Sequence, residues 1–344
     1  MFFHEIKSVL RGEPLHADAF TDEQWSRFTV ELDNNHLLPF FYTYAQNYPH
    51  LPESVVMAAK QRYEDALVIK DYRLAVLNEI RADVCNLGRI VAIKGWALSE
   101  HIYREPLARP MGDIDIYLPD GAIREVVAVF NKNGFFQYGS YENVLSNGKI
   151  HIDLHEDLWN ARRIPSRRDI VEGIPETFVP SSLVPGFFIP TPELLAVHTA
   201  FHCVKHNFSR LIWALDLLLL YKAGCFPGLT SGKNRMFAPY ALEWLAARGF
   251  IDGPIIAPGG PSGVRKTLLD AVTGMTHTTG LGEIALALLC PSWPATCRYL
   301  AASILPPKRI LKEMYGNGRY GWLLLRRVFE LSRHSLGALS WKRK

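Results

Sequence analysis

Two aspartates one residue apart carry the chemistry that this sequence suggests most directly. Asp113 and Asp115 flank Ile114 in the segment 113–118, which otherwise has the composition of a buried strand. Residues two apart in a strand point to the same face, so both carboxylates would project together while Ile114 is buried on the other face. Adjacent carboxylates repel each other unless a cation lies between them, and oxygen ligands at this spacing suit Mg²⁺ or Mn²⁺.

Asp153 is a third carboxylate that the same periodicity brings into consideration. In the segment 150–155, His151, Asp153 and His155 alternate with apolar residues and would therefore share one face of a strand. If this strand lies beside the segment 113–118, three acids form a triad able to hold two metal ions. Such a pair of ions is the arrangement used for in-line displacement at a phosphorus atom.

The aspartate pair also fits a purely structural role. Gly112 precedes it and Pro119 follows it, as at a sheet edge or at the boundary of a turn. The upstream dipeptide Lys94-Gly95, which ends a short apolar strand and opens into a helix, favours the chemical role. A glycine at this place lets phosphates approach backbone N–H groups at the positive end of the helix.

A long helix is expected before these residues. The segment 54–87 has apolar residues at three- and four-residue spacing and contains no glycine or proline. The positions expected to face a core are Val68, Leu74, Leu77, Ile80 and Val84.

The middle of the chain alternates between strand and helix patterns. The expected elements are a strand at 89–93, a helix at 96–104, a strand at 113–118 and a helix at 121–133. A hairpin of 135–145 with 149–154 should follow, because Asn147-Gly148 is a strong signal for a tight turn. This order predicts an α+β fold in which helices pack on a small mixed β-sheet.

The last part of the chain reads as mostly helical. Thr191-Pro192-Glu193 is a good helix start, and one long helix to Tyr221 is expected from it. The predicted organisation is a helical region at 1–88, an α/β core at 89–188, and a helical region with a basic tail at 189–344.

The overall composition is ordinary for a globular protein. Of 344 residues, 48% are hydrophobic and 21% are charged. No apolar run approaches the roughly 18 residues needed to cross a bilayer, and no secretory signal is visible, so we expect the cytoplasm. Five scattered cysteines without a CxxC pair argue against a disulfide framework or a cysteine-based zinc site.

The net charge of +4 is distributed unevenly along the chain. Residues 308–344 contain ten Lys or Arg and two Glu, whereas the remainder carries a net charge of −4. The basic tail favours contact with an anionic surface or an acidic partner, although a solvated helical face also explains it. The acidic remainder is poorly suited to following a phosphate backbone, which disfavours nucleic acid as a partner.

Together these motifs resemble the polymerase-beta-like nucleotidyltransferase superfamily, and within it the bacterial group of uncharacterised nucleotidyltransferases. The resemblance spans most of the chain and rests on Lys94-Gly95, the Arg-rich stretch 104–109, Asp113-Ile114-Asp115 and Ile152-Asp153-Leu154-His155. It implies metal-dependent transfer of a nucleoside monophosphate from a nucleoside triphosphate (NTP) to an acceptor hydroxyl, with release of pyrophosphate. The expected acceptor is a small molecule, a peptide or a protein. A non-catalytic nucleotide- or partner-binding module on the same fold is the alternative.

The resemblance also implies roles for individual residues. Asp113, Asp115 and Asp153 would be the catalytic residues and the ligands of Mg²⁺ or Mn²⁺, and Asp153 would help to deprotonate the acceptor. The residues expected to bind the nucleotide are Lys94, Gly95, Trp96, Arg104, Arg109, His155 and His202.

The chain departs from the superfamily pattern at two points. Gly95 is followed by Trp96 instead of glycine or serine, which removes a serine contact to phosphate, and the 18 positions to the first aspartate exceed the usual gap. Lys94, Arg104 and Arg109 would replace the missing phosphate contacts, or would instead form surface salt bridges.

Three histidines recur every four residues on the helix expected after residue 191. His198, His202 and His206 are compatible with a transition-metal site, with the lining of a nucleotide or acceptor cleft, or with simple packing. No fourth ligand or acidic partner nearby supports zinc. His155, which would share a face with Asp153, is the better candidate for function.

Overall fold

The structure of the chain is a computed structural model. It describes all residues except 1, 16, 18, 49, 104–108, 140–142, 162–163, 227–235, 254–260, 274–278, 328 and 330–344, with the backbone alone described at 279, 280, 313 and 314. Four helices make up the N-terminal part of the chain. They are α1 (Phe3–Arg11), α2 (Asp22–Asn34), α3 (Leu38–Ala45) and α4 (Glu53–Cys85).

Helix α4 confirms the long helix predicted for residues 54–87. Leu77, Ile80 and Val84 are buried, as the spacing predicts. The prediction for Val68 is wrong, because its side chain is 68% exposed. The neighbouring Ile69 lines a pocket, and successive helix positions are about 100° apart, which turns Val68 toward solvent.

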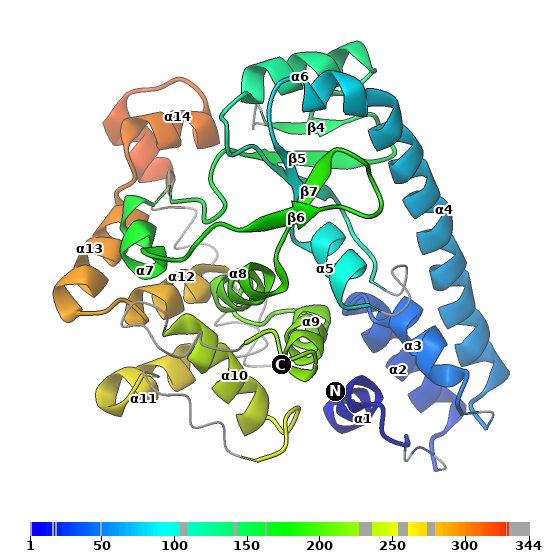
Figure 1. Cartoon of the computed structure of the whole chain (residues 1–344). Coiled ribbons are helices and arrows are strands. Elements are labelled where there is room, and N and C mark those ends of the chain that lie inside the picture. The colour runs from blue at the N-terminus through cyan, green and yellow to red at the C-terminus, as the bar shows by residue number, and fades with distance from the viewer. Residues whose placement is uncertain are drawn as a thin grey trace.

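Seven strands form one mixed sheet, which confirms the predicted α+β class. The strands are β1 (Ile90–Ala92), β2 (Ile114–Tyr117), β3 (Phe136–Gln137), β4 (Val144–Ser146), β5 (His151–His155), β6 (Phe178–Pro180) and β7 (Phe187–Pro190). Their order is β3-β4-β5-β2-β1-β7-β6 (Figure 1). The pairs β2–β5 and β1–β7 are parallel, and the other neighbouring pairs are antiparallel.

The predicted hairpin across Asn147-Gly148 is confirmed by the antiparallel pairing of β4 with β5. The single strand predicted over 135–145 is wrong, because this segment contains two short strands, β3 and β4, that pair with each other. The chain reverses between them, and Gly139 there has a φ of 75°, a left-handed value that glycine adopts at little cost. Neither β6 nor β7 was predicted from the sequence. Strand β7 pairs with β1 and so extends the sheet.

Helices connect the strands and cover both faces of the sheet. They are α5 (Gly95–His101), α6 (Ile123–Lys132) and α7 (Arg168–Val171), the last preceded by a 3₁₀ turn at Pro165–Arg167. Figure 1 places α6 on one face of the sheet and α5 on the other. The buried side chains of α6 are Val126 and Phe130, four positions apart on one helical face.

The rest of the described chain is helical. Its elements are α8 (Pro192–Lys205), α9 (Leu211–Lys222), α10 (Phe237–Ala247), α11 (Gly263–Val272), α12 (Thr279–Leu288), α13 (Trp293–Ile304) and α14 (Lys308–Tyr315). The predicted helix start at Thr191 is confirmed for α8, because the Thr191 hydroxyl accepts a hydrogen bond from the Leu194 N–H. The single helix predicted to Tyr221 is wrong. Asn207 and Phe208 have φ values of 55° and 49°, which no right-handed helix can contain.

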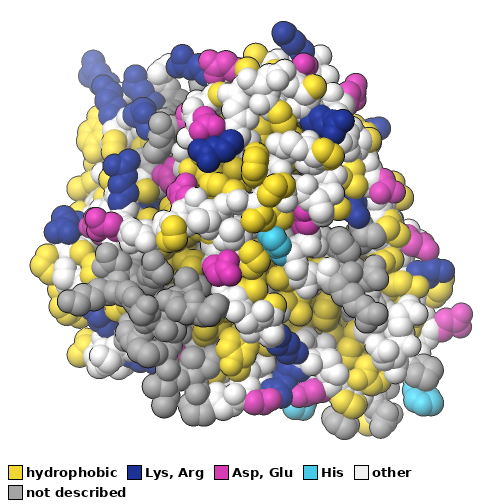
Figure 2. Space-filling model, viewed as in Figure 1, with side chains coloured by type: hydrophobic (Ala, Val, Ile, Leu, Met, Phe, Trp, Pro, Cys, Tyr) yellow, Lys and Arg dark blue, Asp and Glu magenta, His cyan; other side chains and the backbone are white. Residues whose placement is uncertain are grey.

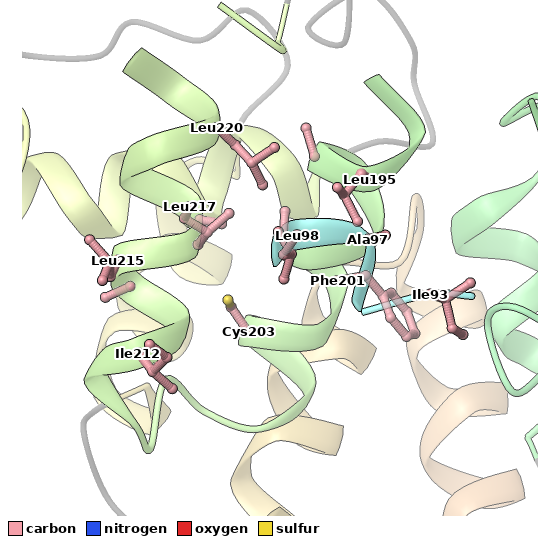
Figure 3. Close-up of a cluster of buried hydrophobic side chains, with 14 of the residues drawn as sticks. Ile93, Ala97, Leu98, Leu195, Phe201, Cys203, Ile212, Leu215, Leu217 and Leu220 are labelled. Atoms are coloured by element: carbon pink, nitrogen blue, oxygen red, sulfur yellow. The ribbon is translucent and has the colours of Figure 1, made fainter. Parts of the chain in front are cut away.

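The core beneath the sheet joins the short helix α5 to α8 and α9. Figure 3 shows Ala97 and Leu98 of α5 pointing among the side chains of Leu195, Phe201 and Leu217. Buried apolar side chains of the described residues form one continuous cluster from Ile6 to Tyr299. The division into three regions stays a prediction.

Basic side chains gather at the upper left of Figure 2, where Figure 1 places α14. Lys308, Arg309 and Lys312 of this helix are exposed. The contact of the basic tail with an anionic surface stays a prediction, and most of the tail lies outside the described residues. In the described ranges, no helix is both long enough and apolar enough to cross a bilayer. The cytoplasmic location also stays a prediction.

Candidate active site

The sheet brings the predicted acids together at the pairing of β2 with β5. The two strands are parallel, and Asp115 lies directly opposite Asp153 in the register. Along β5, the buried Ile152 and Leu154 alternate with half-buried polar residues, as the period of two predicts. The expected neighbourhood of the two aspartates is therefore confirmed, and it places Asp115, Asp153 and His155 on one face.

These three side chains form a compact group of possible metal ligands. One ligand atom from each of Asp115, Asp153 and His155 lies within 4.8 Å of the others. His155 Nε2 is 2.9 Å from Asp115 Oδ1 and 3.3 Å from Asp153 Oδ2. Lys94 Nζ forms an ion pair with the same Oδ1 of Asp115. Two basic groups thus converge on a carboxylate that is only 4% exposed.

The mutual attraction of these groups determines their protonation. Burial alone would raise the pKa of Asp115, but the charge of Lys94 and the hydrogen bond from His155 lower it far below the usual range. Burial and Lys94 lower the pKa of His155, yet its hydrogen bonds to Asp115 and Asp153 raise it above the usual value overall. The group is therefore a charged cluster in which positive side chains balance the two carboxylates.

Asp113 lies at the entrance of this group. It is exposed and lies in a bend of the chain immediately before β2, so the strand begins one residue later than predicted, and it also ends one residue earlier. Partial burial of the carboxylate and the nearby charge of Asp115 raise its pKa. Among the described residues, the possible ligand group contains His155 and not Asp113. The role of Asp113 as a metal ligand stays a prediction.

The turn between β1 and α5 directs Lys94 toward the acids. Lys94 has φ 50° and ψ −123°, a backbone conformation that a residue with a side chain adopts only when its surroundings impose it. At Gly95, an added Cβ would lie 2.7 Å from Arg109 Nη1 and 2.8 Å from Met111 Cγ. The space that this glycine leaves is thus occupied by the segment that leads into β2.

Arg109 is engaged inside the protein. Its Nε and Nη2 each lie 2.9 Å from one oxygen of Asp216, and the Tyr103 hydroxyl donates to the same carboxylate at 2.7 Å. All three side chains are buried. A phosphate contact by Arg109 stays a prediction that requires this pair to open. Arg104, the other predicted arginine, lies outside the described residues.

The predicted histidine row is interrupted where α8 ends. His198 is buried, and its Nε2–H donates to the Leu158 carbonyl at 3.2 Å, while the rings of His202 and His206 pack on Trp213. Burial, with a contribution from the charge of Lys94, lowers the pKa of His198 and His206 to about 3. In the part of the chain that the structure describes, these histidines form no group of possible metal ligands. Nucleotide contact by His202 stays a prediction.

Sequence reasoning missed Arg73, which links α4 to the site. Its side chain is 5% exposed, and Nη2 donates to the carbonyl of Met111 at 2.7 Å. The available signal was its position, four residues before the buried Leu77 and on the same helical face. A charged side chain in an apolar stripe indicates a specific partner, because burying an unpaired charge is unfavourable.

The parallel pair β2–β5 thus brings two carboxylates and a histidine together as possible metal ligands, and the turn after β1 adds a lysine that pairs with Asp115. Residues 21–227 match the family described as uncharacterised nucleotidyltransferases, so the chain belongs to this family. Membership supports a general role in nucleotidyl transfer. No curated protein and no solved structure shows significant similarity to the chain.

Proposed function

We propose that the chain is a metal-dependent nucleotidyltransferase. It moves a nucleoside monophosphate from an NTP to a hydroxyl of a small-molecule, peptide or protein acceptor and releases pyrophosphate. The observation that carries this proposal is the group of Asp115, Asp153 and His155, whose ligand atoms lie within 4.8 Å of one another in a chain of this family.

The donor set fits a hard divalent cation. Two carboxylates supply the oxygen ligands that Mg²⁺ prefers, and the imidazole of His155 is also acceptable to Mn²⁺. The ion pair of Lys94 with Asp115 supports this assignment, because a positive group already lies against the central carboxylate. We assign Asp115 and Asp153 to the metal, with Asp113 as an additional ligand at the entrance.

The reaction requires exchange at the α-phosphorus. The acceptor oxygen bonds to this phosphorus, the bond to the bridging oxygen breaks, and pyrophosphate leaves with that electron pair. Bound Mg²⁺ supplies charge neutralisation for the phosphates and the leaving group. Asp153, which is half-buried and is also assigned to the metal, helps to take the proton from the acceptor hydroxyl.

The remaining residues hold the substrate or the turn that binds it. We assign Lys94 to a phosphate oxygen. Its ammonium pairs with Asp115 in this structure and would leave that carboxylate to contact the phosphate. Arg109 supports this turn from within, because its Nη1 faces Gly95 while Asp216 holds the rest of its guanidinium. A brace of this kind preserves the position of Lys94 without touching the nucleotide.

The test is transfer itself, measured with the full chain. The protein is incubated with Mg²⁺ and labelled ATP, GTP, CTP or UTP in the presence of a bacterial lysate, and mass spectrometry identifies the added mass and the modified species. Asp115→Asn and Asp153→Asn should abolish transfer. The matched control is Asp120→Asn, which removes a carboxylate from a surface ion pair with Arg89 outside the site.

Transfer that survives both active-site substitutions contradicts the mechanism. A chain that binds Mg²⁺ and an NTP but transfers nothing to any acceptor supports the alternative, a non-catalytic binding module. Equal loss in the Asp120 variant shows that the assay reports folding instead of chemistry.

A further inference from the structure

A helix that follows α14 exposes a row of large apolar side chains. Residues 320–327 and 329 are helical. Trp322 is 69% exposed, Leu325 is 64% exposed and Phe329 is 67% exposed. Single exposed apolar side chains are ordinary on a protein surface, whereas a contiguous group of them marks an interaction site.

The three side chains project from one face of this helix. Successive helix positions turn by about 100°, so spacings of three and four residues place the three within an arc of about 60°. Leu323 points elsewhere and is 2% exposed, so it packs on the protein. The Tyr320 hydroxyl donates to the Pro306 carbonyl at 3.4 Å. The helix is therefore held to the protein while its apolar row faces solvent.

Basic side chains surround this row. The Arg326 guanidinium lies over the ring of Tyr315, 5.0 Å from its centroid, which joins the helix to the end of α14. Residues 304–329 contain six Lys or Arg and one Glu. Figure 2 shows hydrophobic side chains beside the basic ones at the upper left, where Figure 1 places α14. The exposed basic residues are Lys308, Arg309, Lys312, Arg319 and Arg326.

The combination of an apolar row with positive charge fits the surface of an anionic bilayer. Tryptophan is enriched at the boundary between headgroups and acyl chains, where leucine and phenylalanine also insert. Lysine and arginine beside such a row are attracted to anionic lipids. A second copy of the chain is disfavoured as the occupant, because the same positive surfaces would repel each other.

The sequence continues with the same composition. Residues 331–344 contain three Leu, one Trp and four Lys or Arg, with no Asp or Glu. A segment that repeatedly combines large apolar residues with positive charge is typical of attachment to a bilayer. An acidic protein partner would account for the charge, but it would not require the repeated apolar residues.

We propose that this surface, made of Trp322, Leu325, Phe329 and the five exposed basic residues around them, attaches the protein reversibly to bilayers that contain anionic lipids. The apolar row enters the headgroup region, and the basic side chains contact the lipid phosphates and carboxylates. The surface lies outside residues 21–227, which match the family. The inference does not depend on the proposed function.

The test is sedimentation of the full chain with vesicles of phosphatidylcholine alone or of phosphatidylcholine mixed equally with phosphatidylserine. The chain should bind the mixed vesicles, and added salt should weaken the binding because it screens the charges. Trp322→Ser with Leu325→Ser should lower the partition coefficient at least about ten-fold, because two large apolar side chains no longer leave water. The matched control is Val68→Ser with Met57→Ser, at exposed apolar positions of α4.

A second pair of substitutions tests the charge. Lys308→Gln with Lys312→Gln should lower binding to the mixed vesicles by about ten-fold and leave binding to neutral vesicles unchanged. Tryptophan emission should shift to shorter wavelength with mixed vesicles, and Trp322→Phe should reduce this shift. Both lysines and Trp322 are exposed, so the unfolding midpoint in urea should stay unchanged in these variants.

Three results would overturn the proposal. The first is the absence of binding to mixed vesicles. The second is equal binding by the Trp322/Leu325 variant and its α4 control, since the apolar row would then have no part in attachment. The third is self-association of the chain without lipid, measured by analytical ultracentrifugation, that the Trp322/Leu325 variant abolishes. That result would assign the row to a second copy of the chain.

Discussion

Two buried carboxylates of this protein, Asp115 and Asp216, are held by positive partners in different ways. Asp216 receives Arg109 on both oxygens and a hydroxyl from Tyr103, so the carboxylate is enclosed by matched donors. Both basic contacts of Asp115 fall on a single oxygen, Oδ1, and a second carboxylate lies beside it.

This difference suits Asp216 to a structural role and Asp115 to the binding role proposed above. A bidentate arginine forms two hydrogen bonds to a carboxylate in a fixed geometry, and this pairing is strong and specific. Lys94 is a flexible point charge and His155 can lose its proton, so their hold on Asp115 can be exchanged for a metal ion or a phosphate. The same residue type is therefore expected to support stability in one region and, under the proposed function, chemistry in the other.

The largest effect should come from Asp115→Asn. Neutralising this side chain removes a metal ligand, and we expect transfer to fall by at least about a thousand-fold, which corresponds to about 4 kcal/mol of activation free energy. The free energy of unfolding should fall less than in Asp216→Asn, because His155 keeps Asp153 as a partner and the ammonium of Lys94 is partly exposed to solvent. An Asp115→Asn variant that unfolds easily but retains transfer would show that Asp115 has the structural role that we give to Asp216.

Asp216→Asn should show the opposite pattern. It leaves the buried guanidinium of Arg109 without a counter-charge, and breaking a buried pair costs about 3–5 kcal/mol of unfolding free energy. Urea unfolding measures this loss. The double variant Arg109→Met with Asp216→Leu should recover part of it, since it removes both charges. If the double variant is no more stable than the single one, the pair is not the brace that we describe.

Tyr103→Phe should sharpen the comparison with a smaller change. It deletes one hydrogen bond to Asp216 and keeps the ring, and a hydrogen bond to a charged group contributes about 1.5–3 kcal/mol. The loss should appear in unfolding free energy and not in the Michaelis constant for the NTP. A raised Michaelis constant at unchanged stability would place Tyr103 in the binding site.

Acidification should distinguish the histidines of the two regions. His198 stays neutral in the folded chain until its pKa of about 3, whereas the unfolded chain binds a proton near pH 6.5. Between these values the unfolded state holds more protons, so stability should fall with decreasing pH by up to about 1.4 kcal/mol per pH unit for this one group. The slope of unfolding free energy against pH should decrease in His198→Gln.

His155 should respond in the opposite direction in metal-free protein. Its raised pKa means that its contribution to stability is complete below about pH 6.5 and is lost as the pH rises through the folded value. His155→Gln should therefore remove a stabilising effect of mild acid. Equal pH slopes in the two histidine variants would show that their surroundings do not differ as described.

The local alternation of residue types predicted the positions of the site residues better than it predicted where the surrounding helices end. The alternation of polar and apolar residues in β5 was sufficient to place Asp153 and His155 on one face, because a strand has a period of two. The end of α8 was missed because Asn207 and Phe208 carry no glycine or proline signal. Their left-handed backbone becomes visible only when the two helices pack.

The sequence alone predicted the class of chemistry, since the acids at 113, 115 and 153 and the lysine before Gly95 are the residue types expected at a site for cations and phosphates. Tertiary structure decided which groups meet. Arg109 joins Asp216 across 107 positions, and Arg73 reaches Met111 across 38. No periodicity encodes such partners, because they depend on where α4 and α9 lie in the folded chain. Packing also created the cavity that Trp96 and Arg73 line.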